Sequence, residues 1–203
     1  MTEERRRCVN LGSGRHPVAS TDEERWTNVD VLDLPGVDQR VDLFRYPWPW
    51  RSGWVDHFRA RHLLEHVPHE IRMTRLIELT RTGELPPTGE RAPRWVRILE
   101  NLPDGFFAFF AEVWRCLAPD GTITCEVPWP LSMETISDPT HTRFVTPQTV
   151  AYLTSPETAA DYRLPFRFEV VGDFRYAADA AHQDDPAALE RARREWGVLH
   201  FWE

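Results

Sequence analysis

Short apolar runs alternate with helix-like segments along most of this 203-residue chain, and that alternation limits the folds open to it. We expect the apolar runs to form strands at residues 8–11, 26–31, 41–43, 54–61 and 122–127. Apolar residues at helical spacing predict helices at 69–81, 106–117 and 147–153. Strands that alternate with helices favour a mostly parallel sheet with helices on both faces. The chain is therefore predicted to be an α/β protein.

The last third of the chain continues this pattern with a change at its end. Strands are expected at 167–176 and 198–202, on either side of a helix at 186–196, and such late strands can form an antiparallel edge of a sheet. An inserted loop region is expected over about 82–104, because residues 82–94 contain three prolines and two glycines. With no internal repeat, residues 1–203 are expected to form one domain.

Charge and basic-residue usage narrow the possible partners. The formal net charge is -8, so no overall basic field gathers nucleic acid, and a nucleic-acid partner is not expected. All 24 basic residues are arginine. The absence of lysine from the sequence excludes a catalytic lysine, a Schiff base and a P-loop lysine.

The cysteines and the N-terminal segment predict a cytoplasmic protein. Cys8, Cys116 and Cys125 are scattered and odd in number, which favours buried, reduced thiols over a disulfide framework or a zinc knuckle. No apolar run approaches the length of a membrane span, so no membrane association is expected. The charged residues 2–7 lead directly into a strand without the apolar core of a signal peptide.

A glycine turn follows the first expected strand. Gly12 and Gly14 follow Leu11 directly, at a place where ligands of α/β proteins bind, and a glycine lets the backbone approach a ligand closely. Asp30 closes the next strand, where a carboxylate can accept both ribose hydroxyls of an adenosine. Together they predict a site for a nucleotide-like cofactor. A purely structural turn, with Asp30 as a solvated acid or a helix cap, is the alternative.

Several segments, taken in order, resemble the consecutive motifs of class I S-adenosylmethionine-dependent methyltransferases, in particular the small group described as type 11-like. The resemblance extends from about Cys8 to Pro128, and residues 138–147 are similar to a loop found after the fifth strand in many of these proteins. The segments that carry it are Asn10–Gly14, Trp26–Asp30, Val41–Leu43 with Pro47–Trp50, Val55–Phe58, His62–Val67 and Glu112–Gly121.

The resemblance implies a Rossmann-like, doubly wound sheet of seven strands in the order 3-2-1-4-5-7-6, with the last strand antiparallel. It also implies methyl transfer (EC 2.1.1 class) from S-adenosylmethionine to an O or N atom of a small-molecule or sugar acceptor. A module of the same fold that binds the cofactor without turnover remains an alternative. The oligomeric state is left open.

Roles for individual residues follow from the same resemblance. Gly12 and Gly14 would lie under the methionine part of the cofactor, and Asp30 would bind the ribose. Asp42 and Leu43 would meet the adenine, and the Arg61–Leu63 turn would face the sulfonium. The complete expected cofactor set is Asn10, Gly12, Ser13, Gly14, Asp30, Val31, Asp42, Leu43, Arg61, His62 and Leu63.

The segment His62–His66 also spells H-x-x-E-H, a signature of inverted zincin metalloproteases. That chemistry needs both histidines on one face of a helix and a third ligand supplied later in the chain. Here the motif follows a strand, and Pro68 comes two residues after it, which disfavours a continuous helix. A zinc hydrolase using His62, Glu65 and His66 is therefore a lesser alternative, and Glu65 and His66 are expected to cap the turn. No metal is predicted.

Residues 138–143 are expected beside the mouth of the cofactor site. His141 is the best-placed base for an acceptor that must lose a proton, and Arg143 could hold an anionic acceptor. Alternatively, Asp138, His141 and Arg143 hold the loop by mutual hydrogen bonds. Trp129, just past the fifth strand, is the tryptophan most expected to line an acceptor pocket.

Overall fold

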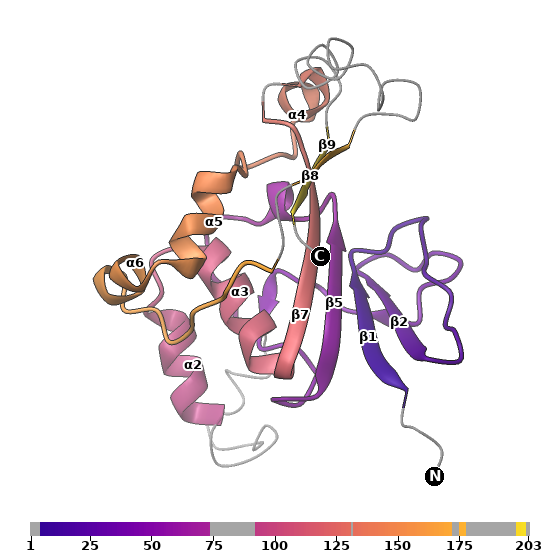
Figure 1. Ribbon diagram of the computed structural model, residues 1–203, viewed down its shortest axis with the longest axis horizontal. Coiled ribbons are helices and arrows are strands. Elements are labelled where there is room, and N and C mark those ends of the chain that lie inside the picture. Colours follow the sequence, from indigo (N-terminus) through magenta and orange to yellow (C-terminus); the bar gives the residue numbers. More distant parts are fainter. Residues whose placement is uncertain (1–4, 74–91, 131, 172–174, 178–197, 202–203) are drawn as a thin grey trace.

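The centre of the fold is a seven-stranded sheet. In the computed structural model, which describes residues 5–73, 92–130, 132–171, 175–177 and 198–201, its order is β3-β2-β1-β5-β7-β9-β8 (Figure 1). The strands are β1 (Arg6–Leu11), β2 (Glu24–Asp30), β3 (Gln39–Arg40), β5 (Val55–Arg61), β7 (Leu117–Pro128), β8 (Arg175–Ala177) and β9 (Val198–Phe201). The pairs among β3, β2, β1, β5 and β7 are parallel, whereas β9 is antiparallel to both β7 and β8. The prediction of a mostly parallel α/β sheet is confirmed.

A second, two-stranded sheet corrects one prediction. Strands β4 (Arg45–Tyr46) and β6 (Arg72–Met73) pair in parallel. The helix expected over 69–81 is therefore wrong at its start, because pairing with a distant strand satisfies the backbone where local periodicity favoured a helix. The remainder of that expected helix lies outside the described residues.

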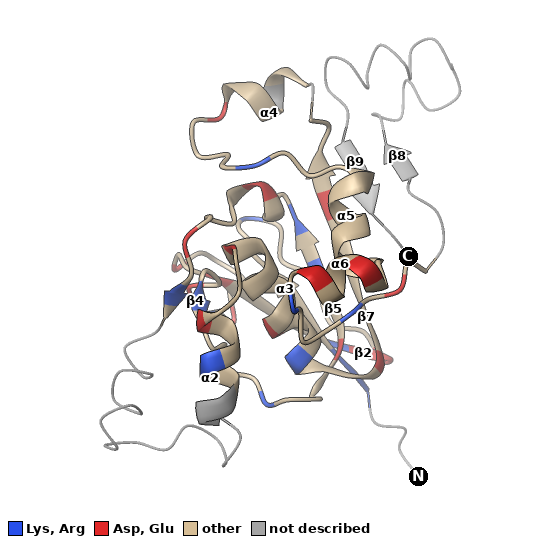
Figure 2. Cartoon of the chain, turned by 90° about the vertical axis from the view of Figure 1, so that its left-hand side faces the viewer, with Lys and Arg blue, Asp and Glu red and all other residues tan. Residues whose placement is uncertain are grey.

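Helices α2 (Ala92–Glu100), α3 (Gly105–Cys116), α5 (Pro147–Thr154) and α6 (Pro156–Asp161) lie on the same side of the strands in two perpendicular views (Figures 1 and 2). Helix α3 is the best anchored: Asp104 caps it by accepting from the Phe106 N–H, and ten of its twelve residues are buried. Helix α2 falls inside the expected loop region of 82–104. The loop prediction is wrong there, since Val96 and Leu99 lie three residues apart and are buried in one face of a helix.

The opposite face of the sheet differs from the expectation of helices on both faces. The connections 12–23 and 31–38 are short and contain no helix, so the described helices that pack on the sheet lie on one side only. The other face presents polar side chains such as His57, Arg59 and Glu126, all partly buried. Two ion pairs join Glu126 to Arg59 and Arg61 across the neighbouring strands.

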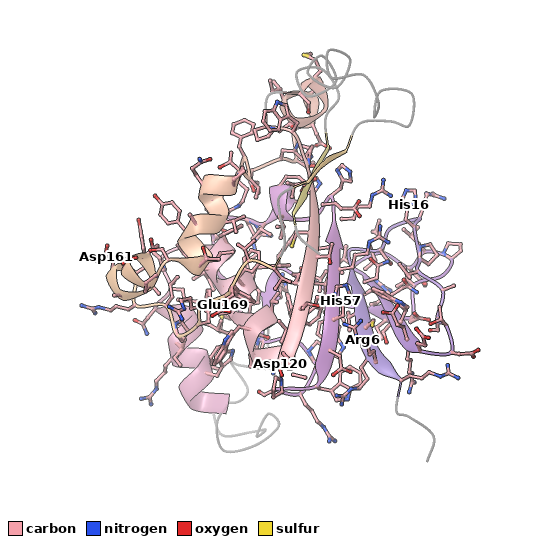
Figure 3. All side chains as sticks on the ribbon, viewed as in Figure 1. Arg6, His16, His57, Asp120, Asp161 and Glu169 are labelled. Atoms are coloured by element: carbon pink, nitrogen blue, oxygen red, sulfur yellow. The ribbon has the colours of Figure 1, made fainter. Side chains whose placement is uncertain are left out.

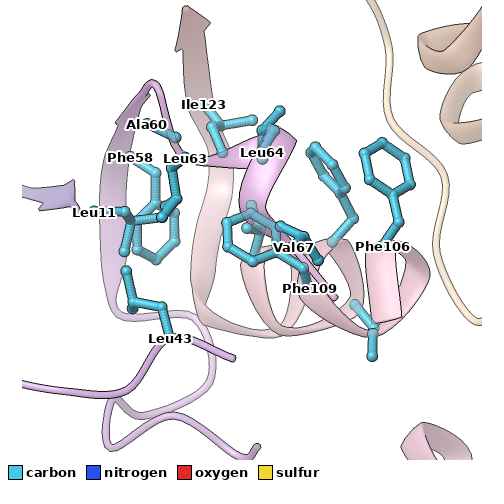
Figure 4. Close-up of a cluster of buried hydrophobic side chains, with 14 of the residues drawn as sticks. Leu11, Leu43, Phe58, Ala60, Leu63, Leu64, Val67, Phe106, Phe109 and Ile123 are labelled. Carbon is cyan, nitrogen blue, oxygen red and sulfur yellow. The ribbon is translucent and has the colours of Figure 1, made fainter. Parts of the chain in front are cut away.

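The hydrophobic core lies between the sheet and α3. Side chains of β5 and β7 alternate, and Phe58, Ala60 and Ile123 point into the core, in one cluster with Phe106 and Phe109 of α3 (Figure 4). The short 3₁₀ helix η1 (Leu64–His66) closes the core beyond β5, with Leu64 buried. Packing of this kind fixes the positions of the strand ends that carry the candidate site.

Other boundaries differ in detail. The third strand is β3 rather than 41–43, because Val41 and Leu43 turn away to pack against the core. Of the strand expected at 167–176, residues 167–171 have no regular structure and only β8 is a strand in the described part. The helix expected at 186–196 lies outside the described residues. The sequence analysis did not predict helix α4 (Met133–Ser137). Among the described residues, no helix is both long enough and apolar enough to cross a bilayer.

Candidate functional site

The carboxyl ends of the parallel strands meet at one edge of the sheet. Leu11 pairs with Val29 on one side and with Ala60 on the other, and Arg61 pairs with Glu126. The residues that follow β1, β2, β5 and β7 are therefore neighbours in space. Ligands of open parallel sheets bind at this edge, in a crevice where the strand order reverses.

The turn after β1 needs glycine for two different reasons. Gly12 has φ 63° and Gly14 has φ 51°, a left-handed conformation that costs an L-residue about 1 kcal/mol or more. A Cβ on Gly12 would also lie 2.9 Å from Leu63 Cδ1, whereas a Cβ on Gly14 would meet no atom within 4 Å. Gly12 thus lets the turn pack on Leu63, and the space over Gly14 is open to a ligand.

Asp30 holds this turn from the end of β2. Its Oδ2 accepts from the Gly14 N–H at 2.9 Å, and its Oδ1 accepts from the Leu32 N–H at 2.9 Å. Each carboxylate oxygen has a second lone pair, so Asp30 can still accept from a ligand. The two sequence features that predicted a cofactor site are joined directly by a hydrogen bond.

Two asparagines shape the 12–23 connection in place of a helix. Asn10 Nδ2 donates to the His16 carbonyl at 3.2 Å and to Asn28 Oδ1 at 3.0 Å. Asn28 in turn bonds both the N–H and the carbonyl of Val18, at 2.7 and 3.0 Å. Within this framework Ser13 is buried, and its Oγ has no hydrogen-bond partner among the described residues. A buried hydroxyl without a partner beside an open glycine turn fits a site that binds a polar ligand.

Other residues of the expected cofactor set lie in different surroundings. Leu43 is 5% exposed and packs in the core, and Asp42 accepts from the Phe44 N–H and from Arg45 Nε. Val31 is 53% exposed at the end of β2, and Arg61 pairs with Glu126 at 2.9 Å. Of these four described residues, Asp42 through its carboxylate and Val31 through its exposed surface are the ones left available to a ligand.

The turn after β5 places a buried carboxylate near the glycine turn. His62 has φ 49°, and only Leu64–His66 are helical, in a 3₁₀ helix that ends at Val67. His62 and His66 therefore do not share a helix face, and the helical geometry needed for the zinc hydrolase reading is absent. Glu65 is 1% exposed, and its two carboxylate oxygens have no hydrogen-bond partner among the described residues. The nearby His62 Nδ1 is 3.4 Å from Oε1 and lacks hydrogen-bond geometry.

The loop after β7 is held against this turn by its backbone. The Thr142 N–H donates to the Glu65 carbonyl at 2.8 Å, and Thr142 Oγ1 donates to the Val67 carbonyl at 2.8 Å. His141 is thereby fixed opposite η1, and its ring centroid is 4.7 Å from that of His66. A nitrogen of each histidine and an oxygen of Glu65 lie within 4.8 Å of one another.

Arg143 is bonded within the protein. Its Nε donates to the Val67 carbonyl at 2.8 Å, a terminal nitrogen is 3.0 Å from Asp104 Oδ1, and its guanidinium lies over the Phe106 ring. Burial raises the pKa of Asp104, but hydrogen bonds from the Phe106 N–H and His69, with the charge of Arg143, outweigh burial and lower it. Arg143 is thus held by residues outside its loop, rather than by the hydrogen bonds to Asp138 and His141 that the sequence analysis offered as an alternative.

Trp129, the first residue after β7, is half-buried and packs against the core. Its carbonyl accepts from Thr135 Oγ1 at 2.6 Å and so anchors α4.

The sequence analysis did not identify Glu65 and His66 as partners of His141. The sequence does place a histidine after each of two expected strands, His66 after β5 and His141 after β7. The two are 75 residues apart, so the sequence alone did not indicate that they meet.

No family model and no curated protein sequence matches this chain. Solved structures similar to it include a SAM-dependent methyltransferase from Archaeoglobus fulgidus, with 15% identity, a TM-score of 0.48, and coverage of 100% of this chain and 88% of that one. Another similar chain comes from the complex between the Haloferax volcanii Trm112 methyltransferase activator and a candidate methyltransferase. It has 14% identity, a TM-score of 0.43, and coverage of 98% of this chain and 82% of that one. At these levels the function has to be inferred from the site itself.

Proposed function

We propose that this protein is an S-adenosylmethionine-dependent methyltransferase that acts on a small acceptor. The observation that carries the proposal is the hydrogen bond from the Gly14 N–H to Asp30 at the carboxyl edge of a parallel sheet. When the strands of that sheet are counted in chain order, their spatial order is 3-2-1-4-5-7-6, the order that the sequence resemblance implies. This order supports the assignment of the edge to that cofactor.

The residues at the edge fit the parts of the cofactor by chemistry. The left-handed glycines leave room for the methionine part, and the buried Ser13 hydroxyl offers a hydrogen bond beside it. Asp30 accepts from the ribose hydroxyls with its remaining lone pairs, and Asp42 can accept from the adenine amine. When bound, S-adenosylmethionine supplies an electrophilic methyl group on a positively charged sulfur.

The acceptor end is formed by the turn after β5 and the loop after β7. His141 Nδ1 donates to the Thr135 carbonyl at 2.9 Å, because a carbonyl can only accept. The Nε2 atom of neutral His141 therefore has a lone pair that can take a proton from an acceptor hydroxyl or amine. Arg143 acts as a positioning residue that holds the loop. We further propose that the chain works as a single domain in the cytoplasm, in agreement with its three buried cysteines, none of which forms a disulfide.

Calorimetry with S-adenosylmethionine and its demethylated product tests the cofactor assignment. Asp30→Asn keeps the size of the side chain but leaves a single acceptor oxygen, so we expect binding to weaken by about tenfold or more, the worth of a charge-assisted hydrogen bond. Asp33→Asn, an exposed acid on the 31–38 connection that follows Asp30, is the matched control and should bind like the wild type. No binding to the wild type, or equal binding by Asp30→Asn, would refute this placement.

Turnover separates an enzyme from a binding module of the same fold. Labelled cofactor is incubated with pools of small hydroxyl- and amine-bearing metabolites, with wild-type protein and with His141→Gln. We expect label transfer by the wild type, and a decrease of about a hundredfold in His141→Gln with cofactor affinity unchanged. Cofactor binding with no transfer to any acceptor would favour the binding module.

A further inference from the structure

Two histidines and a buried carboxylate meet at the acceptor end of the site, and we propose that they bind a divalent transition-metal ion. The three residues are Glu65 and His66 of η1 and His141 of the loop after β7, with one ligand atom of each within 4.8 Å of the others. This set differs from the H-x-x-E-H reading of the sequence, in which His62 was a ligand and His141 was not.

His141 is oriented as a metal ligand. Its Nδ1–H donates to the backbone carbonyl of Thr135, so the proton of the neutral ring is on Nδ1 and the lone pair is on Nε2. Histidines that bind metals almost always donate their other ring N–H to a carbonyl or carboxylate in this way. The Nε2 atom lies 3.7 Å from Asp138 Oδ2, which adds a second negative charge beside the site.

His66 is oriented in the same manner. Thr140 Oγ1 donates its proton to Asp138 Oδ1 at 2.6 Å, and so it can only accept from His66 Nδ1, 3.1 Å away. The Thr140 carbonyl, 3.3 Å from the same nitrogen, is also an acceptor. The proton of His66 is therefore on Nδ1, and its Nε2 is left with a lone pair.

Glu65 supplies the second, independent observation. A carboxylate that is 1% exposed and has no hydrogen-bond partner among the described residues is costly, because burial removes the water that solvates its charge. Its neighbours fix its position: the Glu65 carbonyl accepts from the Thr142 N–H, so backbone bonds join the turn to the loop that carries His141. A cation between Glu65 and the two imidazoles compensates the buried charge.

The donor set selects the class of ion. Two imidazoles and a carboxylate suit Zn²⁺ and its first-row neighbours, whereas Mg²⁺ and Ca²⁺ prefer oxygen ligands. Ligand atoms about 2.1 Å from a zinc ion lie about 3 to 4 Å apart, so binding requires the three side chains to draw together by about 1 Å. Three protein ligands leave a fourth position open, as in catalytic zinc sites.

The three residues are linked to the glycine turn through the turn after β5. Leu63, which touches Gly12, immediately precedes the helix that carries Glu65 and His66. Resting on the proposed function, we infer that the fourth ligand is the oxygen of an acceptor hydroxyl, and that His141, whose one free lone pair then binds the ion, no longer serves as the base. Transfer then forms a C–O bond and breaks the C–S bond, whose electron pair stays on sulfur, while the hydroxyl proton passes to solvent.

Zinc binding is measured first, without cofactor or acceptor. Full-length protein is treated with a chelator, dialysed and titrated with Zn²⁺ by calorimetry, and its metal content is determined by mass spectrometry. We expect one Zn²⁺ per chain, and affinity reduced at least tenfold in Glu65→Gln and in His141→Gln. His16→Gln, on the exposed 12–23 connection, is the matched control and should bind like the wild type.

Thermal unfolding with and without Zn²⁺ distinguishes a variant that has lost zinc binding from one that fails to fold. Zinc should raise the Tm of the wild type and of His16→Gln, and should raise the Tm of a folded Glu65→Gln by less. Substoichiometric zinc in the wild type, or equal zinc affinity in all variants, would overturn the metal site. Because S-adenosylmethionine titrations are carried out separately on the same metal-free protein, failure of the metal site and failure of the methyltransferase proposal give different results.

Discussion

At the scale of single residues, polar side chains at the carboxyl edge of the sheet bond mainly to backbone. Asp30 holds the glycine turn, Asn28 shapes the 12–23 connection, and Arg143 bonds the Val67 carbonyl. Each bond fixes a loop or turn directly to the strand ends beside it. Ser13 Oγ and the Glu65 carboxylate depart from this pattern, and both lie where a ligand is expected.

The two glycines of the turn should differ in how they tolerate a methyl group. Gly14→Ala meets only the left-handed backbone and should destabilise the protein by about 1 kcal/mol. Gly12→Ala adds the contact with Leu63 Cδ1 and should cost about 2 to 3 kcal/mol. Urea unfolding monitored by tryptophan fluorescence measures both. Equal losses of stability would show that Leu63 moves aside freely.

At the scale of elements, α3 is tied to its surroundings through a buried ion pair. Glu112 and Arg115 lie one turn apart, with bonds of 2.8 Å between them. Glu112 also accepts from the Trp48 N–H at 2.6 Å and from Trp95 Nε1 of α2. Burial lowers the pKa of Arg115, but the hydrogen bond and charge of Glu112 outweigh it and raise the pKa above its ordinary value. One carboxylate thus joins α3, α2 and the segment before β5.

Removing that charge should be costly. Glu112→Gln leaves the Arg115 guanidinium buried with no carboxylate, and we expect a loss of about 3 kcal/mol of unfolding free energy. Glu23→Gln, an exposed glutamate of the 12–23 connection, is the control and should change stability by less than about 0.5 kcal/mol. A Glu112→Gln protein as stable as the wild type would mean that the ion pair contributes nothing net.

Prediction from sequence succeeded where local signals and tertiary packing agree. The strands β1, β2 and β5 were recognised by their apolar residues, and α3 by an apolar stretch at helical spacing. It failed where pairing or packing with distant residues decided the outcome, as for Arg72 and Met73 in β6. The convergence of Glu65 and His141 belongs to the same class, because only the pairing of β5 with β7 brings them together.

At the scale of the whole molecule, the polar face of the sheet affects how stability depends on pH. His57 of β5 contacts Thr122 Oγ1 at 2.8 Å and the Trp26 ring edge-on. Burial, with the positive charges of Arg6 and Arg59, lowers the pKa of His57 from its ordinary value of 6.5 to about 4. In Figure 3, His57 lies on the sheet and Arg6 lies at the start of β1. His16 lies beyond the other end of that strand.

The depressed pKa of His57 predicts a loss of stability in mild acid. The unfolded imidazole takes up a proton near pH 6.5 and the folded one only near pH 4, so stability falls as the pH decreases through that interval and then levels for this group. We expect His57 to account for about 2 to 3 kcal/mol of that fall. Urea unfolding between pH 7 and pH 4 should show a shallower dependence for His57→Gln than for His16→Gln. Parallel curves would contradict the assignment.

The docking of the 138–143 loop on η1 has a consequence for the order of folding. Its hydrogen bonds join residues 74 to 77 positions apart in the chain, so closing them costs the entropy of a long loop. The hydrogen bond between Gly14 and Asp30 closes over only 16 positions. We therefore expect the nascent chain to close the glycine turn before the 138–143 loop docks on η1.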